Sequence, residues 1–212
     1  MRTTPTERIQ YIRNLYCQED AVLQAAEQAC DQPIHIAPED AKLIQILLKL
    51  SKAEIGVELG ALAGYSTIWL ARALPATGKL YSIERDAKRY EQTKKSLALS
   101  ELQNVELIFG DAKEKLQELK GQFDFIFIDA NKSGYLGYLD WADVHIKPGG
   151  LIIADNTLLF DEVYKNTPVK ANKKAHQVMR EFNQRLADRS KYETVMLATG
   201  DGLTVAVKES QP

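Results

Sequence analysis

The fold is decided by the stretch EIGVELGALAGYS, which covers residues 54–66. Its first part, Glu54–Leu59, is a short apolar run that ends at Gly60, as is typical of a buried strand in a parallel sheet. A turn with two glycines, Gly60 and Gly64, follows, and residues 65–74 then have helical spacing. A strand, a tight turn and a helix in this order predict the start of a βαβ unit.

The same alternation continues beyond this stretch. Four more short apolar runs are expected to be strands: Lys79–Glu84, Val105–Phe109, Phe123–Asp129 and Leu151–Ala154. Helices are expected between them, two of them capped by Asp86 and Asp111, and the last one ends at the turn 147–150. Strands that alternate with helices predict right-handed crossovers and a parallel sheet.

The two ends of the chain differ from this pattern. After a helix at 171–188, the β runs 192–198 and 203–207 flank the turn Gly200-Asp201-Gly202, which predicts an antiparallel hairpin. We therefore expect an α/β fold with a mostly parallel seven-stranded sheet, a C-terminal antiparallel hairpin and helices on both faces. Residues 1–37 are expected to form a helical prefix, with helices at 6–17 and 20–30, before a helix that Pro38 opens.

Composition limits the class of protein. The chain has 212 residues, 45% of them hydrophobic and 26% charged, the ordinary mix of a globular protein, and this length predicts one domain, 1–212. The formal net charge of −2 argues against a dedicated nucleic-acid wrapper. The sequence has two cysteines without a CxxC pair, no apolar run of about 20 residues and no secretory signal. These features predict a cytoplasmic protein that does not span a membrane.

Carboxylates stand at the carboxyl ends of all five expected parallel strands. They are Glu58, Glu84, Asp111, Asp129 and Asp155. Ligands of open α/β sheets bind at this edge. A single acid here is usually a helix cap, but five acids on one edge repel each other unless a cation lies among them.

The glycine turn narrows the identity of the ligand. Gly60 and Gly64 match neither the dinucleotide fingerprint nor a P-loop, and no Lys or Arg lies between Glu58 and Arg72 to meet a phosphate. Glu84 is placed to accept both hydroxyls of a ribose. A nucleoside without phosphates and with a positive charge fits this edge, and S-adenosylmethionine is that molecule. The alternative interpretation is an ordinary tight turn between a strand and a helix.

A second group of polar residues follows the fourth and fifth strands. Asp129, Asp155 and Asn156 offer two carboxylates and an amide oxygen, which suit a hard cation such as Mg²⁺. The alternative is that Asp155 and Asn156 only cap a loop. Lys132 comes three residues after Asp129, and a neighbouring dication and sulfonium would lower its pKa toward that of a general base. The alternative for Lys132 is a solvated lysine.

Taken together, these residues resemble the cation-dependent O-methyltransferases of the catechol and caffeoyl-CoA type. The matching stretches run in family order from about residue 30 to 208: Pro38-Glu39, Glu58-Leu59-Gly60, Gly64-Tyr65-Ser66, FIDANK at 127–132, DNTL at 155–158, REFN at 180–183 and GDGL at 200–203. The resemblance implies a Rossmann-like class I methyltransferase fold, with the helical prefix contributing to the substrate and cofactor site. It also implies a homodimer.

The resemblance further implies roles for single residues. S-adenosylmethionine would be bound by Ile36, Glu58, Gly60, Ala61, Ser66, Glu84, Asp111, Ala112 and Asp129. Mg²⁺, or another hard divalent cation, would be held by Asp129, Asp155 and Asn156, and the catalytic residues would be Lys132 and Asp129. Two departures from the family pattern are Asn131, where an Asp is common, and the apolar turn 61–63.

Three functions are compatible with these features. The first is an O-methyltransferase that acts on a metal-chelated hydroxyl of a catechol-like small molecule. The second is a relative that methylates 5-hydroxyuridine in tRNA, for which the basic stretch 163–180 would supply phosphate contacts. The third is a non-catalytic nucleotide-binding module. We expect the first, because the metal and lysine positions are intact and the net charge is slightly negative.

Overall fold

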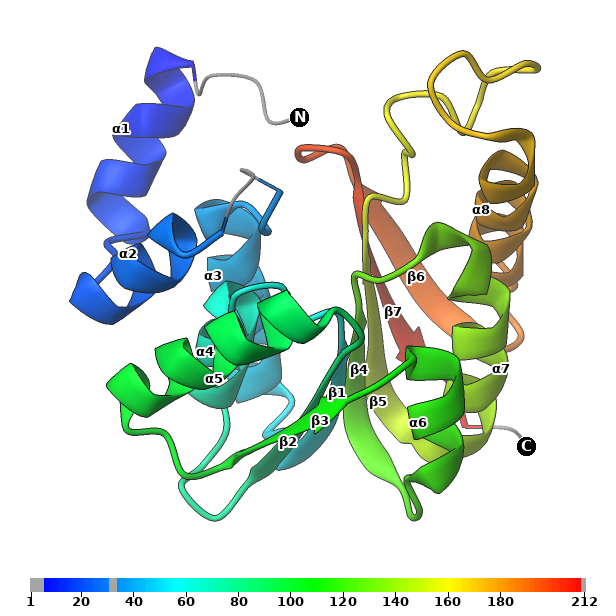
Figure 1. Ribbon diagram of the computed structural model, residues 1–212. Coiled ribbons are helices and arrows are strands. Elements are labelled where there is room, and N and C mark those ends of the chain that lie inside the picture. Colours follow the sequence, from blue (N-terminus) through cyan, green and yellow to red (C-terminus); the bar gives the residue numbers. More distant parts are fainter. Residues whose placement is uncertain (1–5, 31–33, 211–212) are drawn as a thin grey trace. The chain divides into compact units, whose positions relative to one another are not determined.

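The computed structural model describes residues 6–30 and 34–210 (Figure 1). By its internal contacts the chain divides into two compact units. The first unit contains the described residues up to Glu54 together with Ala61–Gly110, and the second contains Ile55–Gly60 and the residues from Asp111 onward. Residues 1–5 and 31–33 of the expected prefix lie outside the described residues.

The first unit carries the N-terminal helices and two strands. Its elements are α1 (Glu7–Tyr16), α2 (Ala21–Gln28), α3 (Pro38–Leu50), α4 (Tyr65–Ala71), β2 (Lys79–Glu84), α5 (Ala87–Ser100) and β3 (Val105–Phe109). The strands β2 and β3 are parallel, with Glu84 opposite Phe109. The helices begin where the sequence predicts, because Asp20 and Asp86 accept backbone N–H groups as N-caps.

Side-chain bonds hold the helical prefix against the rest of the first unit. The Arg13 guanidinium donates to both carboxylate oxygens of Glu39, at 2.7 and 3.1 Å. The carboxylate of Asp20 accepts from Arg72 at 2.7 Å, and the Tyr65 hydroxyl donates to Glu19. These bonds connect α1 to α3, and the chain around α2 to α4.

The second unit contains the other five strands. Its elements are β1 (Ile55–Leu59), α6 (Ala112–Glu118), β4 (Phe123–Ile128), the 3-10 helix η1 (Lys132–Gly134), α7 (Tyr135–His145), β5 (Ile146–Asp155), α8 (Lys173–Leu186), β6 (Tyr192–Leu197) and β7 (Leu203–Lys208). The strands β1, β4 and β5 run parallel, whereas β7 is antiparallel to both β5 and β6. Phe123, Phe125 and Phe127 of β4 are all buried, as expected for a central strand.

The seven strands form one sheet in the order β3-β2-β1-β4-β5-β7-β6. This confirms the predicted α/β fold, with a mostly parallel sheet and a C-terminal antiparallel hairpin. None of the helices among residues 6–30 and 34–210 is long and apolar enough to cross a membrane.

One predicted element boundary is wrong. From the sequence, residues 147–150 are expected to form a turn after the helix and the strand to start at Leu151, but α7 ends at His145 and β5 already begins at Ile146. Ile146 pairs with Phe123 and Leu151 pairs with Phe125, so four residues of β5 lie opposite one residue of β4. This irregular pairing accommodates Pro148, which has no N–H to donate, and Gly149, whose φ is 79°.

Candidate active site

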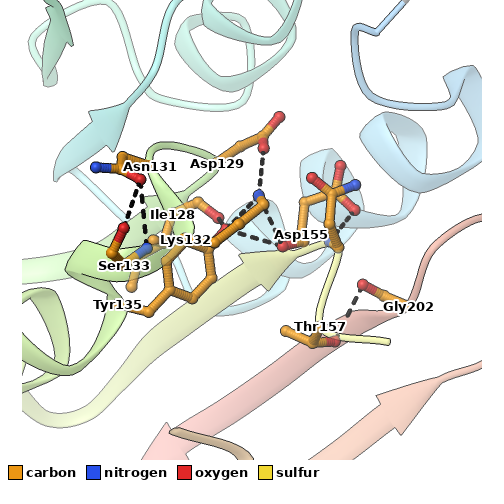
Figure 2. A network of polar contacts seen from close by, with 10 residues as sticks. Ile128, Asp129, Asn131, Lys132, Ser133, Tyr135, Asp155, Thr157 and Gly202 are labelled. Carbon is orange, nitrogen blue, oxygen red and sulfur yellow. Dashed lines mark hydrogen bonds and ion pairs between the residues drawn. The ribbon is translucent and has the colours of Figure 1, made fainter. Parts of the chain in front are cut away.

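Lys132 is the centre of a polar network at the carboxyl ends of β4 and β5 (Figure 2). Its Nζ lies 3.1 Å from Asp129 Oδ1, 2.7 Å from the Tyr135 hydroxyl and 3.5 Å from the backbone carbonyl of Asp155. The side chains of Lys132 and Asp129 are only 20% and 22% exposed. The ion pair is therefore partly shielded from water. This shielding makes it stronger than an ion pair on the surface. Lys132 thus joins two of the predicted metal ligands.

Tyr135 is a site residue that was not predicted from the sequence. Its side chain is fully buried, and its hydroxyl lies 2.9 Å from the carbonyl of Asp155 and 3.1 Å from that of Ile128. The hydroxyl accepts from Lys132, so its own proton is left for these two carbonyls. Its spacing of three residues from Lys132 is a signal that sequence reasoning could have used, because such residues lie on one face of a helical turn.

The environment of Lys132 sets the charge of its side chain. Burial lowers the pKa of the ammonium group, but the neighbouring Tyr135, Asp129 and Asp155 outweigh burial and raise the pKa above its ordinary value. A bound dication and sulfonium are expected to lower this pKa, whereas the groups of the chain itself raise it. The reason is that the nearest groups of the chain are anionic or hydrogen-bond acceptors.

The Asp155–Asn156 pair stands at the end of β5 in a fixed turn. Asp155 is 7% exposed, and its Oδ1 accepts the N–H of Asn156 at 2.7 Å. Asn156 has φ 58°, a left-handed conformation that asparagine tolerates better than most residues. The next residue, Thr157, donates its N–H and its hydroxyl to the carbonyl of Gly202, and its own carbonyl accepts from Asn183. The β6–β7 turn and α8 thus fix the position of the pair.

The donor set of this network fits a hard cation. Asp129, Asp155 and Asn156 offer carboxylate and amide oxygens, which Mg²⁺ prefers over nitrogen or sulfur. Within the part of the chain that the structure describes, no three His, Cys, Asp or Glu side chains gather as a metal-binding group. The predicted set includes only two such residues, because its third ligand is an amide.

Glu84 occupies the end of β2 in the first unit. Its carboxylate is 5% exposed and accepts two backbone N–H groups, those of Leu62 and Asp86, both at 2.9 Å. Each oxygen keeps a further lone pair, so the fixed carboxylate can still accept hydroxyl donors such as those of a ribose. Glu84 also orients the glycine turn, in which Gly64 has φ 90° and donates to Ala61.

The other predicted cofactor residues fall in both units. Ile36, Ala61 and Ser66 belong to the first unit, like Glu84, whereas Glu58, Gly60, Asp111, Ala112 and Asp129 belong to the second. Gly60 has φ 95°, and a Cβ there would lie 2.1 Å from the carbonyl oxygen of Asp129, so only glycine fits. Asp111 caps α6 by accepting the N–H of Lys113. Their roles toward a cofactor stay predictions.

Comparisons with known proteins agree with this arrangement. The O-methyltransferase family model matches residues 14–209. A catechol O-methyltransferase from Niastella koreensis is 36% identical over 93% of this chain and 94% of that enzyme. Caffeoyl-CoA O-methyltransferase 1 from Eucalyptus globulus is 33% identical over 79% of this chain and 72% of its own length. The crystal structure of the O-methyltransferase TomG from Streptomyces achromogenes, in complex with S-adenosylmethionine, superposes with a TM-score of 0.87 at 32% identity, over 95% of each chain.

The chain therefore belongs to the O-methyltransferase family. The resemblance stated from the sequence is confirmed, and so is the prediction of an enzyme. The alternative of a non-catalytic nucleotide-binding module is wrong, since the homologues and the structural neighbours are methyltransferases.

Proposed function

We propose that this enzyme transfers a methyl group from S-adenosylmethionine to one hydroxyl of a catechol-like small molecule, with a hard divalent cation such as Mg²⁺ in its site. The observation that carries the proposal is the network in which Lys132 joins Asp129 to the end of β5. The catechol O-methyltransferase among the relatives supports the class of acceptor, and the S-adenosylmethionine-bound TomG structure supports the methyl donor. We also propose that the chain acts as a cytoplasmic homodimer of one-domain subunits. The sequence predicts the location and the single domain, and the family resemblance implies the homodimer.

The methyl donor would be held by a set of residues that includes Glu84, whose carboxylate two backbone N–H groups already fix. Glu84 would accept the ribose hydroxyls. The methionine end would be lined by Glu58, Gly60, Ala61 and Ser66, the adenine would be bordered by Asp111 and Ala112, and Ile36 would add a backbone contact. The electrostatics suit this ligand, because its sulfonium is positive and the assigned side chains are anionic or neutral.

The cation would be held by Asp129, Asp155 and Asn156. When bound, it supplies a Lewis acid that lowers the pKa of an acceptor hydroxyl. Lys132 has three N–H groups and three oxygen neighbours in the structure, so its geometry favours holding Asp129 in place and, through the cation that Asp129 would bind, orienting the acceptor oxygen. An aligned oxygen and methyl group account for much of the rate in such reactions. Lys132 as the general base is the alternative role.

The test is methyl transfer to catechol by the wild-type enzyme with and without EDTA, with phenol as the acceptor that lacks a second hydroxyl. We expect methylation of catechol, little of phenol, and loss of activity in EDTA that added Mg²⁺ restores. Asp155→Ala should abolish turnover while calorimetry still detects S-adenosylmethionine binding. Full turnover in EDTA would reject the cation, and equal turnover of phenol would reject the chelating acceptor.

A further inference from the structure

Glu162 is a buried carboxylate outside the network described above. Its residue is 1% exposed, although a carboxylate is costly to bury without partners. Three consecutive backbone N–H groups satisfy it. Val169 donates to Oε1 at 3.0 Å, and Lys170 and Ala171 both donate to Oε2 at 2.8 Å. These N–H groups, that of Ala171 foremost, hold the pKa of Glu162 below its usual range.

The same residue is bound through its main chain. Its N–H donates to the carbonyl of Leu158 at 3.0 Å, and its carbonyl oxygen lies 3.1 Å from Nε2 of His176 on α8. A positively charged side chain holds the neighbouring backbone. The Arg180 guanidinium donates to the carbonyls of Val163 and Lys165 at 3.2 and 3.1 Å. Glu162 therefore connects the two ends of the segment 158–171. Its N–H bonds to the carbonyl of Leu158, and its carboxylate accepts from residues 169–171.

This segment, which we call the clamped segment, begins two residues after the predicted metal ligand Asn156. Leu158 donates its N–H to the carbonyl of Asp201 in the β6–β7 turn at 2.8 Å. The large side chains of Phe160, Tyr164 and Val169 are exposed on the segment, by 48%, 61% and 85%. Large exposed side chains on a segment that follows a predicted metal ligand so closely in the chain are suited to contact an aromatic acceptor.

The backbone of the clamped segment is strained. Leu159, Phe160 and Asp161 have φ values of 52°, 58° and 61°, in the left-handed region that residues with a side chain rarely adopt. Strain of this kind persists only when surrounding contacts over-determine the conformation. The three N–H bonds to Glu162 are such contacts. They fix the residue that directly follows the strained stretch 159–161 to residues 169–171.

We propose that Glu162 is a positioning residue for the methyl acceptor, since its carboxylate holds the clamped segment in the one conformation that receives the acceptor. This inference rests on the proposed function. Without the carboxylate, the segment samples other conformations, and the apparent acceptor affinity falls by the fraction of molecules that remain competent. The segment carries none of the residues assigned to the methyl donor or the cation. The predicted effect is therefore a higher KM for the acceptor, with kcat and donor affinity retained.

The experiment compares wild type with Glu162→Gln, Glu162→Ala and the control Glu193→Gln, which changes an exposed glutamate on β6. Glutamine keeps one acceptor oxygen and alanine keeps none, so the effect should be graded. We expect the KM for catechol to rise about threefold in Glu162→Gln and about tenfold in Glu162→Ala, because KM scales inversely with the competent fraction. The Kd for S-adenosylhomocysteine, measured by calorimetry, should stay within about twofold of wild type.

Limited trypsin digestion provides a second readout that does not depend on turnover. Lys165 and Lys170 are exposed cleavage sites within the clamped segment. The Glu162 variants should be cut there faster than wild type and the control, with the fragments identified by mass spectrometry. Unchanged cleavage and an unchanged KM in Glu162→Ala would overturn the inference, and so would faster cleavage with an unchanged KM. A wild-type enzyme that does not methylate catechol would instead refute the proposed function.

Discussion

The role of single residues in this site follows from how many bonds each polar atom makes. The Tyr135 hydroxyl accepts from Lys132 and lies within hydrogen-bond distance of two backbone carbonyls, at the ends of β4 and β5. Lys132 in turn engages Asp129. One buried hydroxyl therefore connects a strand end to the lysine that the sequence singles out. Removing it tests whether the network positions Lys132 or only fills space.

Tyr135→Phe should lower both stability and turnover. It deletes a buried hydroxyl and leaves backbone carbonyls without their donor, which typically costs about 1–3 kcal/mol. We expect kcat for catechol to fall about tenfold, equivalent to about 1.4 kcal/mol, with unchanged affinity for S-adenosylmethionine. Thermal unfolding, steady-state kinetics and calorimetry measure the three quantities. Tyr16→Phe, at an exposed position, is the control, and a kcat equal to its value would show that the hydroxyl does not position Lys132.

At the scale of elements, the helical prefix depends on a few side chains. Asp20 is the N-cap of α2 and also pairs with Arg72, which follows α4. Burial raises the pKa of its carboxyl, but the N–H of Leu23 and the guanidinium of Arg72 outweigh burial and leave the pKa below its ordinary value. The ionised form is therefore the one that the folded chain stabilises.

Asp20→Ala should destabilise the protein by about 1 kcal/mol, the usual cost of losing an N-cap, and Asp20→Asn by less, because asparagine is also a good cap. The folded pKa is lowered, so the contribution of the charge is complete above the unfolded value of about 3.9 and is lost as pH falls through the folded pKa. Thermal melts of wild type and Asp20→Asn should therefore differ at pH 6 and converge toward pH 3. A difference that persists unchanged at low pH would contradict an electrostatic contribution.

At the scale of the whole molecule, charge distribution separates the two substrate classes. The net charge is −2, yet four exposed lysines lie in or just after the clamped segment: Lys165, Lys170, Lys173 and Lys174. In an enzyme that acts on tRNA they would contact phosphates, and each contact would contribute about −0.7 to −0.9 to the slope of log affinity against log salt. In an enzyme that acts on a small molecule they are solvated side chains.

We expect weak tRNA binding, and catechol methylation that is nearly unchanged when Lys170, Lys173 and Lys174 are replaced together by alanine. Filter binding across a salt series measures the affinity for tRNA. Methyl transfer to catechol and to total tRNA measures the activity on each acceptor. The clamp on Glu162 uses the backbone N–H of Lys170, which the substitution retains. Tight tRNA binding, with a salt slope that drops by about two or more in the triple variant, would favour the tRNA enzyme.

Local sequence determined the elements and the chemistry-bearing positions. Apolar runs bounded by glycine and acidic caps predict six of the seven strands closely, because burial and turn conformation depend on residues near one another in the chain. The start of β5 could not be read in this way. Pro148 and Gly149 have the composition of a turn, and only the pairing of Ile146 with Phe123 shows that they lie within a strand.

The sequence by itself thus determined the α/β fold, the family, and the positions of Glu84, Asp129, Lys132, Asp155 and Asn156. Tertiary structure alone decided the partners of these groups. The raised pKa of Lys132 depends on Tyr135 and Asp155, and the burial of Glu162 depends on N–H groups at residues 169–171. The physical reason is that a pKa and a clamp are properties of atoms brought together in space, whereas periodicity and capping are properties of neighbours along the chain.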